Sequence, residues 1–285
     1  MAIDISQRIR RKYSTFSKGQ KKIATAILQD YDKVAFMTAA RLGRLVGVSE
    51  STVVRFAGEL GFEGYAEFQR AVQELMRIKL TPNQRIAVTK NRVGRLDMID
   101  CVMEADIRKI RYTLKHINRE HFHNAVGAII SARNIYIMGA RSSEALAYFL
   151  KYNLTLIFDN VKYVQPTSSA ELFEQLLAIN EQDVLIAFSF PRYFNKMISA
   201  VKFAKQSNAK VVVITDSEVS PLAEHASFLL TAQSDMASFS DSLVAPFSIL
   251  NALIAEIAQQ IEGRITRRFE KLEKVWDEYN VYSKR

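Results

Sequence analysis

The sequence predicts an α plus α/β protein, in which an all-helical N-terminal domain is followed by a three-layer α/β/α domain with a parallel five-stranded sheet. Two observations support this prediction. In the first part of the chain, apolar residues recur at spacings of three and four, which is the period of amphipathic helices. From Asn134 onward, short β-rich runs alternate with helical patterns, as in a parallel sheet covered by helices.

The first domain is expected to span residues 1–79. Ser17 and Gln20 fit a capping box, in which the serine hydroxyl and the glutamine side chain each satisfy a free backbone N–H at a helix start. A turn is predicted at residues 61–64, followed by a last helix that closes a small core. The apolar face of that helix consists of Tyr65, Phe68, Val72, Leu75 and Met76.

Residues 80–119 are predicted to connect the two domains. The stretch 80–96 is polar and basic and is interpreted as a linker. Pro82 ends the preceding helix, because proline lacks a backbone donor and pushes its predecessor out of the α region. Helices are expected over residues 97–117 and 121–132.

The second domain is expected to span residues 120–285. Its strands are short and rich in β-branched residues, and the third is a continuous apolar run, as expected when both faces of a strand are covered. Small molecules bind such sheets at the carboxyl ends of the strands. The predicted strands are residues 135–138, 161–164, 184–188, 211–214 and 228–230.

The stretch 38–61 predicts two short helices joined by a tight turn. The first has an apolar face of Leu42, Leu45 and Val46 and stops at Gly47, which tolerates the positive φ of a helix end. Ser49 then fits an N-cap, because its hydroxyl can accept a free backbone N–H of the next turn. The predicted buried face of the second helix consists of Val53, Phe56 and Leu60.

Small polar and charged residues occupy the opposite face of this second helix, near its N-terminus. In a helix-turn-helix, these first turns enter the major groove of DNA. We therefore predict contact with double-stranded DNA; the alternative is an ordinary helical hairpin with a solvated polar face. The residues expected to contact DNA are Ser49, Glu50, Ser51, Thr52 and Arg55.

The charge distribution favours the same interpretation. Residues 1–90 carry 16 Lys and Arg against 8 Asp and Glu, whereas residues 91–285 carry 23 against 22. The formal net charge of +9 therefore lies almost entirely beside the predicted helix-turn-helix. Neutralisation of phosphates by Lys and Arg supplies the sequence-independent part of DNA affinity. A basic surface without a nucleic-acid partner is the alternative.

Two loops at carboxyl ends of predicted strands combine serines and arginines with a helix start. Helix N-termini attract anions, and the arginine fork matches phosphate or carboxylate. We therefore predict a small anionic effector at this edge of the sheet; capped helix starts with solvated arginines are the alternative. The residues expected to bind the effector are Arg141, Ser142, Ser143, Ser189, Arg192 and Tyr193.

The chain resembles bacterial RpiR/MurR-type transcriptional regulators, which join an N-terminal helix-turn-helix to a C-terminal sugar isomerase (SIS) domain. The most specific stretches are Gly47–Phe56, Gly61–Phe68 and Val212–Asp216 with Ser220–Ala223. The resemblance implies a doubly wound sheet, a dimer, and sensing of a phosphorylated sugar that alters DNA binding.

The sequence departs from this family at the expected phosphate loops. A second glycine often follows the first strand of SIS domains, and here that position is Arg141. The usual Ser-x-Ser-Gly-x-Thr loop would begin near Ser189, but residues 188–193 read FSFPRY, without Gly or Thr. The resemblance therefore carries over Ser142, Ser143 and Ser189 as hydroxyl contacts, while the class of effector stays open beyond a carbohydrate-type anion.

The composition limits other function classes. One cysteine, Cys101, rules out an internal disulfide framework and indicates a reducing compartment, so we expect a cytoplasmic protein without a membrane span. No zinc-ligand spacing is present, and we expect no metal, no cofactor and no catalytic residues. An aldose–ketose isomerase is the alternative function. Its candidate acid–base groups are Glu144, Glu171, Glu174 and His225.

A homodimer or tetramer is expected, because a single helix-turn-helix reads too few base pairs for a genome. The main subunit contact is placed in residues 120–285. The apolar stretch 247–260 fits either the core or a subunit interface, and the charged final helix 263–285 carries Trp276 with other aromatic residues.

Overall fold

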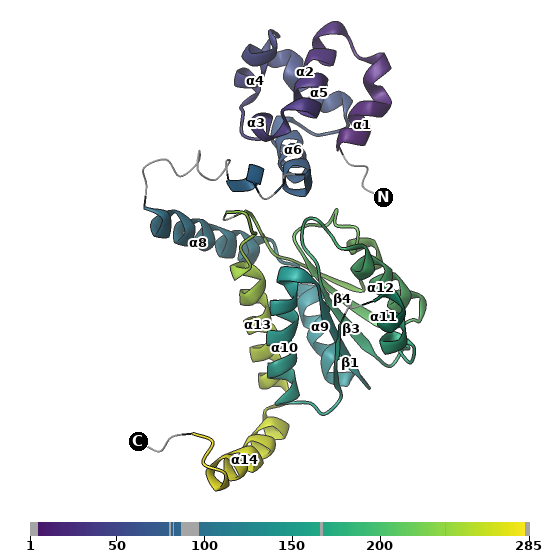
Figure 1. The fold of residues 1–285 in the computed structure, drawn as a ribbon, viewed down its shortest axis with the longest axis vertical. Coiled ribbons are helices and arrows are strands. Elements are labelled where there is room, and N and C mark those ends of the chain that lie inside the picture. Colours follow the sequence, from purple (N-terminus) through teal and green to yellow (C-terminus); the bar gives the residue numbers. More distant parts are fainter. Residues whose placement is uncertain are drawn as a thin grey trace. The chain divides into compact units, whose positions relative to one another are not determined.

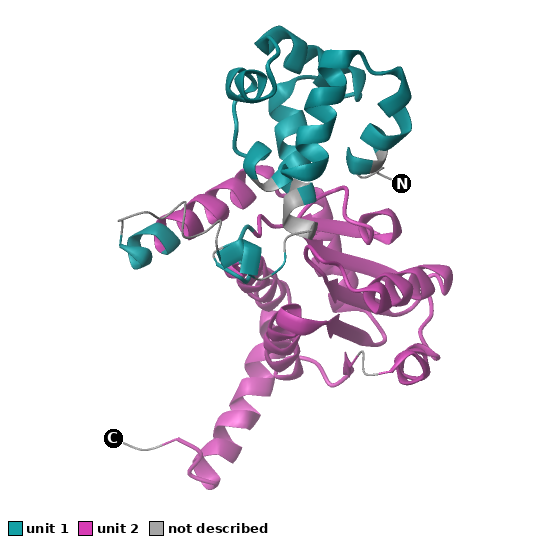
Figure 2. Ribbon diagram, turned by 45° about the horizontal axis from the view of Figure 1, so that its top comes forward, with its two compact units in different colours: residues 1–102, 235–241 teal, residues 103–234, 242–285 magenta. Residues whose placement is uncertain are grey.

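The computed structural model describes residues 5–79, 81, 83–86, 97–165, 168–236 and 238–282. These residues divide into two compact units: unit 1 comprises residues 1–102 and 235–241, and unit 2 comprises residues 103–234 and 242–285 (Figure 2). Most of the predicted linker, residues 87–96, lies outside the described residues.

Unit 1 is helical, as predicted (Figure 1). The predicted capping box forms: Gln20 N donates to Ser17 Oγ, and Ser17 N donates to Gln20 Oε1. Phe56 fills the centre of the core, edge-to-face with Phe16 at 5.0 Å and with Phe68 at 6.0 Å between ring centroids. The helices are α1 (Ile5–Lys12), η1 (Tyr13–Thr15), α2 (Lys18–Gln29), α3 (Tyr31–Val34), α4 (Ala39–Val46), α5 (Glu50–Glu59) and α6 (Tyr65–Lys79).

Unit 2 alternates strands and helices. Its first helix, α8, begins in unit 1, because the division falls between Val102 and Met103. The elements are α8 (Met98–His116), α9 (Arg119–Ser131), β1 (Ile135–Gly139), η2 (Arg141–Ser143), α10 (Glu144–Thr155), β2 (Val161–Val164), α11 (Ser169–Leu176), β3 (Val184–Phe188), α12 (Asn195–Gln206), β4 (Lys210–Thr215), η3 (Ala223–His225), β5 (Phe228–Thr231), α13 (Val244–Gln260) and α14 (Glu262–Glu278).

The five strands form one parallel sheet in the order β2-β1-β3-β4-β5. Side chains alternate between its faces with the period of two expected for strands. On β1, Ile135 and Ile137 face a core shared with α9, α10 and α13, whereas Tyr136 and Met138 face a core shared with α11 and α12. The predicted three-layer α/β/α arrangement is therefore confirmed.

Two details of the sequence interpretation are resolved by burial. Leu45 shares the helical spacing of Leu42 and Val46, but it is 56% exposed, because α4 packs through Ala39, Leu42 and Gly43. In α13, Ile249, Leu253 and Ile257 are buried within the core of unit 2, so this face of the helix belongs to the core.

Unit 1 also includes the segment 235–241, which follows β5 in the sequence. Met236 is buried in the same apolar cluster as the helices of unit 1. Arg85, which is only 4% exposed, donates from Nη1 to Asp241 Oδ1 at 3.0 Å. Unit 1 is therefore discontinuous in the sequence.

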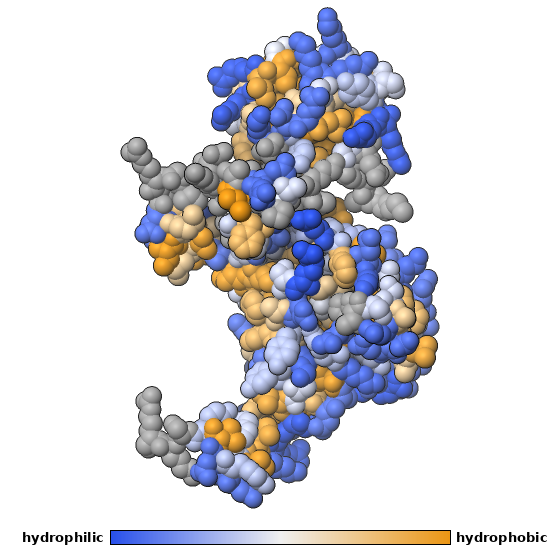
Figure 3. Space-filling model, viewed as in Figure 1, coloured by the Kyte–Doolittle hydropathy of each residue, from blue (hydrophilic) through white to orange (hydrophobic). Residues whose placement is uncertain are grey.

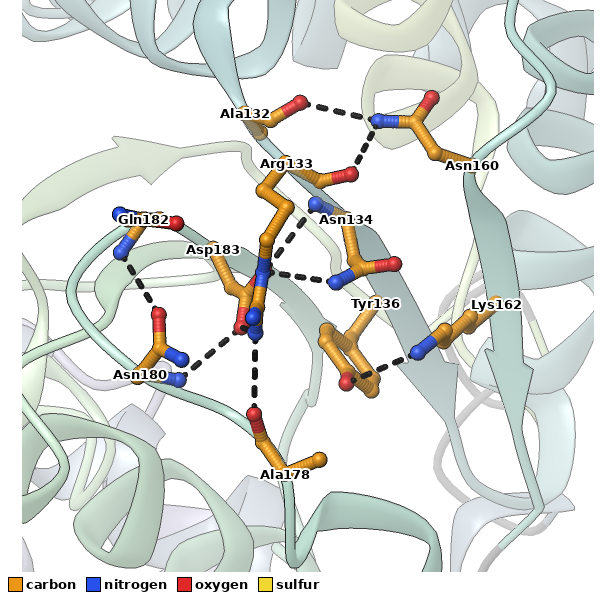
Figure 4. A network of polar contacts seen from close by, with 10 residues as sticks. All are labelled: Ala132, Arg133, Asn134, Tyr136, Asn160, Lys162, Ala178, Asn180, Gln182 and Asp183. Carbon is orange, nitrogen blue, oxygen red and sulfur yellow. Dashed lines mark hydrogen bonds and ion pairs between the residues drawn. The ribbon is translucent and has the colours of Figure 1, made fainter.

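A buried carboxylate fixes the amino edge of the sheet (Figure 4). Asp183, directly before β3, accepts from Arg133 Nε and Nη2 at 3.0 and 2.6 Å, from Asn134 N and Nδ2, and from Asn180 N. Burial by itself would raise the pKa of Asp183, but these hydrogen bonds outweigh it and hold the pKa below its ordinary value. The strands β1 and β3 are thus tied together at the end opposite to the predicted effector site.

No single helix in the described part of the chain is long and apolar enough to cross a membrane. The pair α13 and α14, bent by 98°, satisfies the criteria of length and composition when taken together.

Candidate DNA interface and effector site

The 38–61 stretch folds as two helices joined by a tight turn. Gly47 ends α4 with φ of 70°, in the left-handed region that glycine enters without strain. Ser49 then caps α5, because its Oγ accepts a hydrogen bond from Thr52 N at 3.3 Å. Val53 and Phe56 are fully buried, as predicted. The opposite side of α5 is thereby turned outward.

The five residues predicted to contact DNA lie on this outward side. Ser49, Glu50, Ser51 and Arg55 are exposed, and Thr52 is half-buried. The Ser49 hydroxyl lies 2.9 Å from Ser51 Oγ and 2.8 Å from Thr52 Oγ1, so the three hydroxyls form one cluster at the helix start. Arg55 Nε donates to Ser51 O within the helix, at 3.3 Å. This arrangement can present hydroxyls, a carboxylate and a guanidinium to base edges.

Sequence reasoning missed Val54, which is 41% exposed beside Arg55. An exposed apolar side chain on such a helix can contact the methyl group of thymine. The signal was present in the sequence, since Val54 falls outside the spacing of the buried face formed by Val53 and Phe56.

Two cations of α1 hold the C-terminal end of α5. Arg8 Nη1 donates to Leu60 O at 3.2 Å, and Lys12 Nζ donates to Glu59 O at 2.6 Å. Positive charge at a helix C-terminus is favourable because it satisfies free carbonyls and opposes the negative end of the helix dipole. These two charges therefore orient α5.

The lysines of α2 flank the other end of α5. A Cβ atom on Gly19 would lie 3.4 Å from Val48 Cγ1 and 3.8 Å from Thr52 Cγ2, so the start of α2 abuts the turn and the first turn of α5. Lys22 Nζ lies 3.8 Å from the Cβ position of Gly47. A surface groove at this place is lined by Lys18, Lys21, Lys22, Thr25, Ala26, Gln29, Asp30, Leu45 and Val46.

The two predicted effector loops meet at the point where the strand order reverses. β1 and β3 are neighbours, with Gly139 in register with Phe188. β2 lies on the other side of β1, and β4 lies on the other side of β3, so the strand order runs outward in both directions from this pair. Open α/β sheets bind ligands at this switch point. A Cβ atom on Gly139 would lie 2.4 Å from Ser143 O, so only glycine permits η2 to fold this closely over the end of β1.

Two serines and two helix starts supply groups for an anion. Ser143 and Ser189 are only 5% and 4% exposed. The helices that follow them, α10 and α12, begin without a side-chain cap, whereas Ser168 caps α11. The neighbouring Ser142 is exposed.

Both predicted arginines adopt the left-handed backbone conformation. φ is 58° at Arg141 and 66° at Arg192, and both side chains are exposed. This region costs a residue with a Cβ atom roughly 1–2 kcal/mol. Such strain is concentrated at functional sites, where another role of the side chain maintains it.

Tyr193 is bound to a residue that sequence reasoning did not include. Its hydroxyl donates to Asp216 Oδ1 at 2.8 Å, and Thr215 Oγ1 donates to the same oxygen at 3.2 Å. Asp216 directly follows β4, so a third strand end contributes to this edge. The position of Asp216 directly after a predicted strand could have indicated that it belongs to this edge of the sheet.

The candidate acid–base groups for isomerase chemistry take part in local contacts. The Tyr163 hydroxyl donates to Glu144 Oε1 at 3.0 Å, and burial together with this bond raises the pKa of Tyr163 to about 12. Glu171 completes a capping box at the start of α11. His225 lies 3.2 Å from Glu224, and Glu174 is exposed. In the described part of the chain, no three His, Cys, Asp or Glu residues are grouped to hold a metal ion.

Comparison with known families assigns both halves of the chain. Residues 3–77 match the helix-turn-helix domain of the rpiR family, and residues 128–256 match the SIS domain. A similar curated protein is an uncharacterised helix-turn-helix-type transcriptional regulator of Haemophilus influenzae, which is 26% identical over 229 residues, covering 80% of this chain and 79% of that protein.

Two solved structures are also similar. The sugar isomerase domain of an RpiR transcription factor from Sphaerobacter thermophilus is 28% identical, with a TM-score of 0.58, and the match covers 61% of this chain and 96% of that one. The NanR protein of Vibrio vulnificus, complexed with ManNAc-6P, is 21% identical, with a TM-score of 0.62 over 98% of this chain and all of that one. The second likeness shows the fold along the whole chain.

Proposed function

Because the chain belongs to the RpiR family of helix-turn-helix transcriptional regulators with a SIS domain, we propose that a small anionic carbohydrate derivative controls its binding to operator DNA. In this proposal residues 1–79 bind DNA, residues 120–285 bind the effector, residues 80–119 connect them, and the protein acts as a homodimer or tetramer in the cytoplasm. The observation that carries it is the pair of Arg–Ser loops at the sheet switch point, in a chain that also presents a capped, outward-facing α5.

A sugar phosphate is the best-supported effector class. NanR, which shares the fold, was solved with ManNAc-6P. The two buried serines and the uncapped starts of α10 and α12 offer donors to a phosphate. Arg141 and Arg192 stand where glycine is the usual residue for a positive φ, and their guanidinium groups can replace backbone contacts to the anion.

A thermal-shift screen tests the effector class. Sugar phosphates, including ManNAc-6P, are compared with sugar acids, unphosphorylated sugars and inorganic phosphate. A ligand that binds only the folded protein raises the unfolding temperature. The hit is then added to an operator titration, where it must change the Kd for DNA. Failure of every phosphorylated or carboxylated sugar to shift both quantities would contradict the proposal.

Replacing Arg55 by alanine is expected to weaken binding to the operator. If its guanidinium contacts a guanine edge, the loss is about 1–3 kcal/mol and is confined to specific DNA. If it contacts a phosphate, binding to unrelated DNA falls equally. Fluorescence anisotropy with operator and scrambled duplexes distinguishes the two cases. Arg70→Ala is a control of the same charge change in unit 1, and unaltered operator affinity in Arg55→Ala would remove this residue from the interface.

Lys18 and Lys22 are expected to bind phosphates on one side of the groove that α5 enters. Each is exposed beside the turn, and a phosphate contact releases about one counterion. Replacing both by glutamine should weaken specific and non-specific binding alike and reduce the slope of log Kd against log salt by about 2. Lys33→Gln, in which the lysine pairs with Asp30 on α3, should leave the slope unchanged. Equal slopes in the two variants would contradict this assignment.

A sugar-phosphate isomerase is the second candidate, because SIS domains are also named as sugar isomerase domains. The fold and the switch-point position favour it, but the contacts of Glu144 and Glu171 favour structural roles for both. Incubation with aldose and ketose phosphates, followed by NMR, decides between the two functions. Interconversion above the buffer rate would support the enzyme.

A further inference from the structure

Helix α14 is 17 residues long, yet none of its residues is buried. It turns away from α13 by 98° and projects from the rest of unit 2 (Figure 1). Its first turns are held to unit 2: Arg268 donates to Asp159 Oδ1 at 2.7 Å and to Thr155 O at 3.2 Å, Arg264 lies over the Phe158 ring at 5.2 Å, and Ile265 packs against the core. Most of the stability of a helix in a protein comes from the packing of its apolar face against other elements.

One side of α14 carries an apolar stripe. Its residues recur at intervals of four, three, four and three, which is the heptad spacing of a helix-pairing seam. Apolar atoms of this region reach the surface over α14 (Figure 3). An open groove of about 620 Å³ follows the helix and is lined by Ile265, Thr266, Phe269, Glu270, Glu273 and Lys274. The stripe consists of Ile265, Phe269, Leu272 and Trp276 of α14 and of Tyr279, which directly follows the helix.

The charges of α14 are balanced but unevenly placed. The helix has five basic and five acidic residues. Arg264, Arg267 and Arg268 lie in its first half, whereas Asp277 and Glu278 end it, with no base in the last turn. The helix therefore carries no net charge that would repel a second copy of itself.

We propose that α14 is an arm that pairs antiparallel with α14 of a second copy of this chain, with Leu272 at the two-fold axis. The stripe supports this geometry, because its residues lie three and seven positions before Leu272 and four and seven positions after it. Two antiparallel copies centred on Leu272 therefore bring stripe residues opposite one another. A helix of zero net charge favours a second copy over nucleic acid or an anionic membrane, both of which select basic surfaces. The proposal rests on the proposed regulator in one respect, namely that two DNA half-sites require a dimer.

The mass of the full-length protein in solution tests the pairing. Phe269→Gln combined with Leu272→Gln should give the monomer mass by light scattering at concentrations where the wild type is dimeric. The matched control, Lys271→Gln, removes a charge from an exposed position of α14 outside the groove and should stay dimeric. Circular dichroism and the unfolding temperature verify that both variants are folded.

Cross-linking tests the orientation independently. In a Cys101→Ser background, Leu272→Cys should form an intersubunit disulfide, because the two copies of this residue meet at the axis. Ile265→Cys alone should not, since antiparallel copies would place its two positions roughly 20 Å apart. Ile265→Cys mixed with Tyr279→Cys should cross-link. Efficient cross-linking of Ile265→Cys with itself would overturn the antiparallel arrangement.

Two outcomes would contradict the proposed pairing of the two α14 helices: a monomeric wild type, or a dimeric Phe269→Gln/Leu272→Gln variant. In the second case the exposed apolar face of α8, with Ile99, Met103 and Ile107, becomes the interface to test. Operator binding by the wild type is measured in parallel. If the wild type binds its operator while the double variant stays dimeric, the pairing of α14 is contradicted, but the proposed function as a DNA-binding regulator is not.

Discussion

Replacing Asp183 by alanine is expected to lower the free energy of unfolding of unit 2 by about 1.5–3 kcal/mol, the range for hydrogen bonds to a charged group. The Asp183 side chain is fully buried, and it accepts hydrogen bonds from Arg133, Asn134 and Asn180. Alanine would remove the acceptor shared by the half-buried Asn134 and Asn180 and by the more exposed Arg133. Urea titration followed by circular dichroism measures the change.

The same carboxylate makes the stability of unit 2 dependent on pH. Its pKa is lowered in the folded protein, so its contribution is fully present above the ordinary pKa of an aspartate and is lost as the pH falls through the lowered value. The Asp183→Ala variant should therefore lose less stability on acidification than the wild type does.

Asp159→Ala is the matched control. Asp159 also pairs with an arginine, Arg268 at 2.7 Å, but its side chain is 82% exposed, and exposed pairs contribute about 0–1 kcal/mol. Equal destabilisation by the Asp159 and Asp183 substitutions would show that the network at the amino edge does not stabilise the sheet more than a surface pair does.

Replacing Arg192 by glycine is expected to separate stability from effector binding. Glycine adopts the φ of 66° without strain, so the stability of unit 2 should stay unchanged or rise by up to about 1 kcal/mol. Loss of the guanidinium should weaken binding of an anionic effector by about 1.5–3 kcal/mol, the range for a hydrogen bond to a charged group. Ser143→Ala should also weaken it, and both variants should still bind operator DNA without effector.

Isothermal titration and operator titration of the same samples measure these changes. Arg111→Ala and Ser199→Ala, both exposed positions of unit 2 outside the two loops, are the controls. An effector can change DNA affinity only through a difference in its own affinity for the two states. If Arg192→Gly and Ser143→Ala respond to the effector like the wild type, the effector binds elsewhere.

The fold followed from local signals in the sequence. Ser17 and Ser49 cap helices because their hydroxyls satisfy N–H groups three residues away, and Gly47 ends α4 because it tolerates positive φ. The strands of unit 2 were visible as continuous apolar runs, since both faces of the sheet are covered.

Features that depend on distant residues could not be derived in this way. In the Asp183 network, Arg133 and Asn134 precede Asp183 by 50 and 49 positions. No pattern in the sequence around Asp183 predicts these contacts. The positive φ of Arg141 and Arg192 is imposed by the loops around them. Leu45 matched the helical spacing of a core residue, yet α4 packs through Ala39, Leu42 and Gly43. The assignment of residues to DNA and effector stays a prediction.

The discontinuity of unit 1 has a consequence for how such proteins can be recombined. A chimaera that exchanges residues 1–102 for those of another regulator would keep the native segment 235–241. Met236 would then enter a foreign core, and Asp241 would meet whatever residue replaces Arg85. Residues 1–102 therefore cannot be transferred as an independent folding unit. Transplanting its specificity requires either both segments together or a graft confined to the outward face of α5.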